Sequence, residues 1–329
     1  MTTLVTGATG FVGSAVVRCL MEVGHRVRVM VRTDSVRTNI QGLDVEVVEA
    51  DLMRPGTLRN AVAGCDTLFH VAADYRLWVR DSEVLYRANV GGTKNLMEAA
   101  YEEGVSRIVY TSSVATLGLN QDGTPGDENT PVDFANIIGH YKRSKYLAEQ
   151  TVQRMAYELQ LPVIIVNPSA PIGPRDVKPT PTGRMILDAA RGRMPAYVDT
   201  GLNVVHVDDV AQGHLLALER GEFGRRYILG GEDITLREIL AIISEITGRP
   251  APKIRLPHNL VLPIGYISQA WAWLTHGAEP RVTVDGVRMS KKLMYFSSEK
   301  ARKALGYNPR PARQALEDAV EWFLQNDYR

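Results

Sequence analysis

The chain has 329 residues, which is long for one hydrophobic core and predicts two lobes. Its 38 basic and 37 acidic residues nearly cancel, so the composition shows no cationic footprint for binding nucleic acid. The two cysteines, Cys19 and Cys65, lack the spacing of metal ligands, so we expect two buried free thiols and no metal. A strand that begins almost at Met1 leaves no visible signal peptide, and we therefore expect a cytoplasmic protein.

Three glycines mark a strand-to-helix turn near the start, in the stretch Thr6-Gly7-Ala8-Thr9-Gly10-Phe11-Val12-Gly13. A β-prone run precedes this stretch, and an amphipathic run with a helical apolar face follows it. Gly7 permits a tight turn, Gly10 lets the backbone approach a pyrophosphate, and Gly13 lets the helix pack on the strand. The helix N-terminus then faces the anion. This context predicts a dinucleotide site, and the alternative is an ordinary turn with incidental glycines.

The next 150 residues alternate between strand and helix patterns. The expected strands are 3–5, 26–32, 45–49, 67–71, 107–110 and 163–166, and the expected helices are 12–23, 57–63, 82–103 and 139–159. This alternation predicts an α/β fold with a doubly wound parallel sheet of the Rossmann type. Ligands of such sheets bind beyond the carboxyl ends of the strands.

The pattern changes after residue 167, where five prolines crowd into positions 168–181. Helices are expected at 182–191, 208–220, 236–247 and 311–325, with short strands at 203–207 and 225–229. We therefore expect a dinucleotide-binding domain at 1–167 and a smaller C-terminal α+β substrate-binding lobe at 168–329. Part of the lobe's sequence is expected to return to the Rossmann sheet.

Three side chains are candidates for acid–base chemistry. Tyr141 and Lys145 lie four residues apart on a predicted helix, so they share a face. A nearby ammonium favours the phenolate and lowers the pKa of a tyrosine toward neutrality. Ser113 follows a strand whose carboxyl end points to the same crevice, where its hydroxyl can hold a substrate oxygen. Taken separately, a Tyr–Lys pair is most often a solvated helix face and a serine after a strand is most often a turn former.

Combined with the glycine turn, these residues resemble the extended short-chain dehydrogenase/reductase family, also called the NAD-dependent epimerase/dehydratase family. Within it the chain resembles the dihydroflavonol 4-reductase-like branch, and the stretch Asn167–Pro174 is similar to that of bacterial hopanoid-associated sugar epimerases. The supporting motifs run along nearly the whole chain: Thr111-Ser112-Ser113, Tyr141-x-x-x-Lys145, Asp51-Leu52, His70-Val71-Ala72-Ala73, Asn89-Val90-x-Gly92-Thr93, His206-Val207-Asp208-Asp209, and Lys300-Ala301 with Leu305-Gly306-Tyr307-x-Pro309.

The resemblance implies a role for each matching residue. Tyr141 would donate or accept the proton, Lys145 would lower its pKa and bind the nicotinamide ribose, and Ser113 would position the substrate oxygen. Asn89 would support the site. The cofactor would contact Gly7, Thr9, Gly10, Phe11, Val12 and Gly13 in the turn, Asp51 and Leu52 at the adenine, Ala72 and Ala73 after the fourth strand, and Pro168 near the nicotinamide.

The residue at the end of the second strand bears on the cofactor. NAD sites usually carry an acid there, whereas this chain has Arg32, whose guanidinium suits a ribose 2′-phosphate. Arg37 is a possible second contact. NADP is therefore favoured, and the alternative is NAD, with Arg32 a surface cation and Asp34 on the ribose. Use of NADP favours net reduction but does not exclude epimerisation. A non-catalytic dinucleotide sensor is a further alternative.

Several departures from the family pattern concern the substrate. Residues 114–117 lack the acidic pair of dehydratases, so β-elimination is set aside. Leu202-Asn203 stands where epimerases carry Arg-Asp, and Ala170 replaces an asparagine, which argues against a nucleotide-diphosphate sugar. A lipid-linked sugar, a polyol or a ketone fits better. Tyr75, Trp78, Ser169 and Lys178 are candidates for the substrate wall, with packing or surface roles as the alternative.

Two further stretches have both a structural and a functional interpretation. The apolar segment 260–274 is too short to span a bilayer; it predicts a helix over the substrate cleft or, alternatively, a lid or a peripheral membrane contact. Asp208 and Asp209 are expected to cap a helix start, with His206 a packed loop-end residue rather than a metal ligand. The resemblance also implies a homodimer through two long helices, to which Leu85, Leu96 and Leu147 would contribute.

Overall fold

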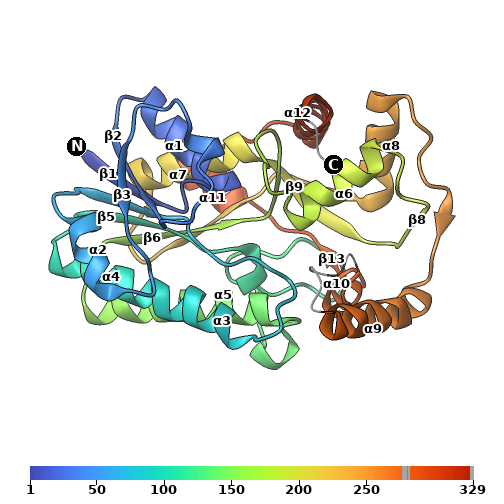
Figure 1. Cartoon of the computed structure of the whole chain (residues 1–329), viewed down its shortest axis with the longest axis horizontal. Coiled ribbons are helices and arrows are strands. Elements are labelled where there is room, and N and C mark those ends of the chain that lie inside the picture. Colours follow the sequence, from blue (N-terminus) through green and yellow to red (C-terminus); the bar gives the residue numbers. More distant parts are fainter. Residues whose placement is uncertain (276–279, 281, 327–329) are drawn as a thin grey trace.

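A seven-stranded parallel sheet forms the centre of the computed structural model, which describes residues 1–275, 280 and 282–326. The strand order is β3-β2-β1-β4-β5-β6-β10, so the chain starts in the middle and winds outward in both directions, as in a Rossmann fold (Figure 1). The strands are β1 (Thr2–Thr6), β2 (Arg26–Val31), β3 (Glu46–Glu49), β4 (Thr67–His70), β5 (Arg107–Thr111), β6 (Val163–Pro168) and β10 (Arg226–Leu229). The last strand belongs to the C-terminal half, and it returns to pair with β6 at the sheet edge.

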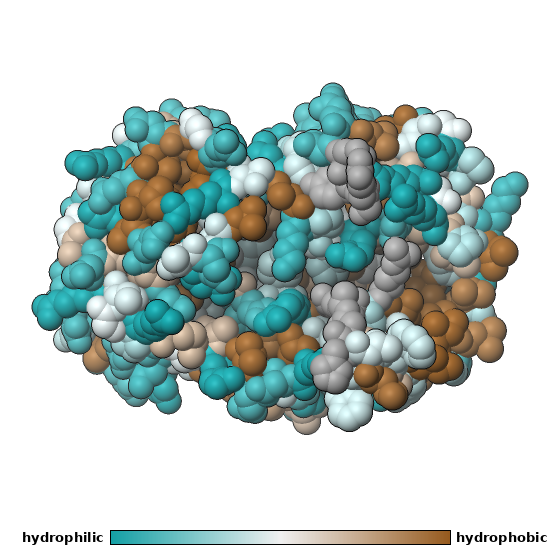
Figure 2. Space-filling model, viewed as in Figure 1, coloured by the Kyte–Doolittle hydropathy of each residue, from teal (hydrophilic) through white to brown (hydrophobic). Residues whose placement is uncertain are grey.

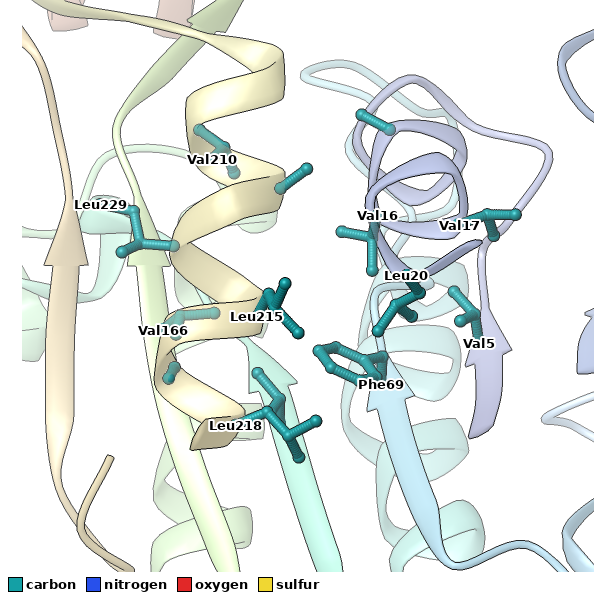
Figure 3. Packing of buried hydrophobic residues seen from close by; sticks show 14 of the residues in the cluster. Val5, Val16, Val17, Leu20, Phe69, Val166, Val210, Leu215, Leu218 and Leu229 are labelled. Atoms are coloured by element: carbon teal, nitrogen blue, oxygen red, sulfur yellow. The ribbon is translucent and has the colours of Figure 1, made fainter. Parts of the chain in front are cut away.

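Helices cover both faces of this sheet. On one face lie α1 (Phe11–Glu22), α7 (Val207–Arg220) and α11 (Glu299–Leu305), and on the other lie α2 (Pro55–Val62), α4 (Gly92–Glu102) and α5 (His140–Glu158). Figure 3 shows Val16 and Leu20 of α1 facing Leu215 of α7 over Phe69 of the sheet. Because both faces are covered, the strands carry nearly continuous apolar runs, and β6 is buried along its whole length.

A second, smaller sheet builds the C-terminal lobe. It contains β7 (Ala170–Ile172), β9 (Gly201–His206), β11 (Glu232–Thr235) and β13 (Leu293–Met294), with β11 antiparallel to β9. Packed with it are α6 (Pro181–Ala190), α8 (Leu236–Thr247) and α12 (Ala312–Gln325), whose apolar faces share one core. A two-stranded pairing of β8 (Ala196–Tyr197) with β12 (Ile254–Arg255) leads to α9 (His258–Leu274) and α10 (Val284–Met289), which pack together.

The region expected as one helix at 82–103 has three parts. These are α3 (Glu83–Tyr86), a π-helical turn at Arg87–Gly91 and α4. Asn89 lies in the π turn, where its amide donates to the Asp74 carbonyl at 2.9 Å and to the Ser144 hydroxyl at 2.9 Å. A π turn adds one residue to the helical repeat and often occurs at functional sites, because it redirects a side chain.

The surroundings of several predicted residues differ from the expectation. Cys65 is buried, but Cys19 is only half-buried, because its thiol lies at the helix edge and donates to Gln212 at 3.5 Å. Leu85 and Leu96 pack inside the chain and cannot belong to a dimer surface, so of the three only Leu147 is exposed. The dimer itself stays a prediction. In the described ranges, no helix is both long and apolar enough to cross a bilayer.

Candidate functional site

The glycine turn joins β1 to α1 at the carboxyl edge of the sheet. Gly7 has a φ of +70°, and its carbonyl accepts from the Gly10 amide at 2.9 Å. A Cβ at Gly13 would lie 2.1 Å from the Gly7 oxygen, so only glycine allows this close packing. Gly10 starts the helix without a side-chain cap, and a Cβ there would meet only one atom, the Gly7 oxygen. The first-turn amides and the open side of Gly10 therefore fit a pyrophosphate.

A series of hydrogen bonds between buried polar side chains of the sheet and α4 holds this turn in place. Thr6 shares a hydrogen bond of 2.8 Å with His70, and His70 shares one of 2.9 Å with Thr93. The Ala72 amide donates to the Thr6 hydroxyl at 3.2 Å, which ties the loop after β4 to the turn. Burial lowers the pKa of His70 to about 3, so the ring is neutral. Sequence reasoning treated His70 as part of a motif but did not assign it this bracing role.

The end of β2 carries exposed ion pairs. Arg32 Nε lies 3.5 Å from an Asp34 carboxylate oxygen, and Arg37 binds Glu49 at 2.6 Å. The Arg32 side chain is 66% exposed, so its guanidinium can leave the weak pair with Asp34 to meet a phosphate. Nearby, the Asn39 amide donates to the Thr9 carbonyl at 3.2 Å and holds the turn at this edge.

The other candidate cofactor contacts lie at the carboxyl ends of three more strands of the same sheet. Asp51 and Leu52 come after β3, and the Leu52 carbonyl accepts from Asn95 of α4 at 2.8 Å. Ala72 is half-buried after β4, whereas the following Ala73 is exposed. Pro168 is buried at the end of β6. The parallel strands bring these residues to one edge of the sheet, where the glycine turn also lies.

Ser113 and Tyr141 meet although they belong to separate elements. Ser113 follows β5, where its hydroxyl accepts from the Ala115 amide at 3.1 Å and caps a 3₁₀ turn (Val114–Thr116). The Ser113 hydroxyl lies near Tyr141, in the first turn of α5, and favours the charged form of its phenol. Burial raises the pKa of Tyr141 to about 12, and the Ser113 contact opposes this shift. The expectation of a lowered pKa is therefore not met, because desolvation outweighs the favourable contact.

Lys145 points from α5 into the sheet. Its ammonium donates to the Thr111 carbonyl at 2.9 Å and to the Tyr110 hydroxyl at 3.4 Å, and it lies 5.0 Å from the Tyr110 ring centre. Burial lowers the pKa of Lys145 to about 8. Lys145 therefore lies one helical turn after Tyr141 on α5, and its ammonium is bound to the end of β5.

A buried carboxylate connects the elements that carry these residues. Glu149 lies on α5 one turn after Lys145 and is 1% exposed. It accepts from the Ser112 hydroxyl, from Thr116 at 2.8 Å, from Asn167 at 2.8 Å and from Arg226 at 3.1 Å. It thus ties α5 to the loop after β5, to β6 and to β10. Sequence reasoning missed Glu149; its signal is an acid on the apolar side of an otherwise amphipathic helix.

Lys142, next to Tyr141, is a second residue that sequence reasoning missed. Its ammonium lies 3.7 Å from the Met294 sulfur, a weak acceptor. Burial and, to a smaller extent, the charge of Lys292 lower its pKa to about 8. A cation in such surroundings destabilises the folded chain unless an anion approaches it.

The candidate substrate residues lie in different surroundings. Tyr75 is exposed and Trp78 half-buried in the loop after β4. The buried hydroxyl of Ser169, just after β6, has no partner in the described structure. Lys178 is exposed in the loop before α6. Asn203 points inward, where its amide donates to Asp233 at 2.7 Å and to the Phe296 carbonyl at 3.0 Å.

His206 itself caps α7, which corrects the expectation that the two aspartates do so. Its ring accepts from the Asp208 amide at 3.0 Å, and its other nitrogen lies 3.0 Å from Asp318. Asp208 pairs with Arg175, and Asp209 with Arg310 at 2.8 Å. Among the described residues, no three metal-ligating side chains are grouped to hold an ion.

Comparison with known proteins places the chain among enzymes of one family. Residues 3–230 match the profile of the NAD dependent epimerase/dehydratase family. A "Putative dihydroflavonol 4-reductase" of Synechocystis sp. is 48% identical, over 98% of this chain and 95% of the relative. "Sterol demethylase protein B" of Methylococcus capsulatus is 37% identical, over 99% of both chains. The crystal structure of gox2253 superimposes with a TM-score of 0.89 and 58% identity, over 98% of both chains. The chain is thus an NAD(P)-dependent enzyme and belongs to the NAD-dependent epimerase/dehydratase family, the extended short-chain dehydrogenases/reductases.

Proposed function

We propose that this enzyme oxidises or reduces a secondary alcohol or ketone carbon of a sugar-like, lipid-linked substrate, using NADP. The observation that carries the proposal is the packing of α5, which bears Tyr141 in its first turn, against the 3₁₀ turn that Ser113 caps at the carboxyl edge of the sheet. Two hydroxyls from separate elements meet there, beside the turn that fits a pyrophosphate. When bound, the nicotinamide would donate or accept the hydride at the reacting carbon.

The side chains supply the proton and the orientation. With a pKa of about 12, Tyr141 is protonated at neutral pH and can donate to a carbonyl oxygen that becomes an alkoxide. Ser113 would hold the same oxygen, so that the substrate is contacted by both hydroxyls. Lys145 would stabilise the phenolate that remains, since it lies four residues, or one helical turn, after Tyr141 on α5.

Arg32 and Arg37 support NADP over NAD. Each lies in an exposed pair with a carboxylate, so a 2′-phosphate can replace the carboxylate with little loss. We expect Arg32→Ala to weaken NADPH binding about tenfold or more and to leave NADH binding nearly unchanged, which titration calorimetry measures. Asp34→Ala is the matched control. If Arg32→Ala weakened the binding of NADPH and NADH equally, that result would argue for NAD.

The lobe favours a substrate without a nucleotide diphosphate. Asn203 is committed to internal hydrogen bonds, and Leu202 packs on the lobe's core, so neither presents a charge to a diphosphate. A relative named for sterol demethylation is similar over its full length. A sugar or polyol carried on a polycyclic lipid such as a hopanoid fits these observations.

Tyr141→Phe tests the chemistry directly. We expect turnover to fall by about 10²–10⁴-fold, because the proton donor is lost, while nucleotide binding is retained. The measurement is nicotinamide absorbance with a panel of lipid-linked sugars and ketones, after the co-purified nucleotide has been identified. Tyr157→Phe, which removes an exposed hydroxyl, is the control. Full activity of Tyr141→Phe would overturn the proposed mechanism.

A net ketone reductase of the dihydroflavonol 4-reductase type is the second candidate. Arg32 favours it, since NADPH is the usual reductant for net reduction, and so does the name of the 48% identical relative. The two functions differ in stoichiometry: a reductase consumes one NADPH per product, whereas an epimerase inverts its substrate with the absorbance unchanged at equilibrium.

A further inference from the structure

The helix α9 presents most of its large apolar side chains to the solvent and not to the protein interior. Its buried positions are the small residues Gly265 and Ala272, which face α10 and neighbouring loops. Its large side chains point outward, and Leu260, Ile264, Ile267, Trp271 and Leu274 are each more than half exposed. Figure 2 shows hydrophobic residues gathered at the lower right of the molecule, where Figure 1 places α9.

The exposed apolar face is broad and continuous. At 100° per residue, these five positions and the equally exposed Tyr266 and Trp273 cover about half of the helix circumference. The helix is about 25 Å long from its 17 residues. It contains no Asp, Glu, Lys or Arg. An isolated exposed leucine needs no explanation, but a face of this size marks an interaction surface.

Three cationic side chains contact α9. The Arg288 guanidinium donates to the Tyr266 hydroxyl at 3.1 Å, Lys291 donates to Asn259 at 3.1 Å, and Arg80 donates to the Ala272 carbonyl at 3.2 Å. Residues 250–275 contain Lys253 and Arg255 and no acidic residue. The whole chain has a formal charge of only +1, so this cationic border is local. It complements a surface that is both apolar and anionic.

A second copy of the chain fits the face less well. Two helices that pair use a narrow seam of apolar residues with charged side chains on both sides, which set the register. The face of α9 is about twice as wide, and the helix has no charged residue to flank a seam. The tryptophans and Tyr266 have an apolar ring with one polar group, which suits the boundary between headgroups and acyl chains.

We propose that α9 lies in the surface of an anionic lipid bilayer, parallel to its plane. The apolar face would enter the headgroup boundary, and Arg80, Arg288 and Lys291 would meet lipid phosphates. The proposal does not depend on the reaction assigned above, although it would bring the enzyme to a substrate carried on a lipid.

Vesicle sedimentation of the full chain tests the surface. We expect binding to phosphatidylglycerol vesicles, weaker binding to phosphatidylcholine vesicles, and a decrease as salt rises. Trp271→Ser with Trp273→Ser should lower the affinity at least about tenfold. Arg288→Glu with Lys291→Glu should remove the preference for the anionic lipid. Phe223→Ser, an exposed aromatic residue far from α9 in sequence, is the control and should bind as the original chain does.

A second measurement avoids dependence on the folding of variants. Brominated phosphatidylglycerol should quench the tryptophan fluorescence of the unaltered chain if Trp271 and Trp273 enter the bilayer. Absence of both binding and quenching overturns the proposal. The proposal is also overturned if light scattering shows that Trp271→Ser with Trp273→Ser converts a dimer to a monomer. The apolar face of α9 would then be an interface between two copies of the chain.

Discussion

Gly10 and Gly13 are three residues apart in one turn, but their surroundings differ. A Cβ at Gly13 would overlap the Gly7 carbonyl, whereas a Cβ at Gly10 would point to open space apart from one contact of 3.2 Å. We expect Gly13→Ala to lower the free energy of unfolding by about 2–3 kcal/mol, because the backbone must move. Gly10→Ala should cost less than about 1 kcal/mol and weaken NADP binding about tenfold. Urea unfolding and calorimetry separate the two; equal stability losses would contradict this reading of the turn.

Lys142 gives a pH-dependent prediction at the same scale. Its pKa is about 8 in the folded chain and near 10.5 when exposed. Below pH 8 the lysine is charged in both the folded and the unfolded state, and its burial lowers the free energy of unfolding by the full amount. Between pH 8 and 10.5 only the unfolded state is protonated, so the free energy of unfolding rises with pH. We expect Lys142→Met to stabilise the chain by about 1–2 kcal/mol at pH 7 and this gain to vanish near pH 10.5. Lys303→Met, at an exposed lysine, is the control, and a pH-independent gain would exclude the burial cost as its cause.

At the scale of elements, Glu149 holds together the strands and the helix that carry the site. It is buried and accepts from residues of the β5 loop, β6 and β10. We expect Glu149→Ala to lower the free energy of unfolding by about 3–5 kcal/mol, because the Arg226 guanidinium loses its carboxylate partner. Gln153→Ala, which removes only a 3.3 Å contact to the same carboxylate, should cost under about 0.5 kcal/mol. A similar loss for both variants would deny Glu149 this connecting role.

For the whole molecule, cofactor binding and folding stability are linked. The dinucleotide contacts expected here come from the carboxyl ends of five strands and from α5, and they converge only in the folded chain. A nucleotide at one hundred times its dissociation constant should therefore add about 2.7 kcal/mol of stability. Thermal unfolding should show a larger rise with NADPH than with equal NADH. A larger rise with NADH would contradict the assignment of Arg32 to the 2′-phosphate.

Local sequence patterns determined much of this protein. The order of strands and helices, the doubly wound sheet and the glycine turn all depend on the spacing of neighbouring residues, which the chain itself displays. The limits of α8 agree with the expected 236–247, because a Thr235–Glu238 capping box and Gly248 mark its ends within the sequence. The single helix expected at 82–103 is interrupted by the π turn, in which Asn89 donates to Ser144, a partner 55 residues away that local patterns do not display.

Contacts between residues distant in the sequence decided the charge states, the supporting contacts and the exposed surface. Burial, rather than the spacing of Tyr141 and Lys145, raises the pKa of the tyrosine, and the depth of a side chain depends on every element packed around it. The partners of Glu149 come from positions up to 77 residues away. The outward face of α9 has the composition of a buried helix, and only its packing on α10 shows which side meets the solvent. The sequence by itself therefore determined the fold and the family's residues, whereas the tertiary structure decided their charge states, their supports and the exposed surface, because desolvation and contact are properties of the assembled chain.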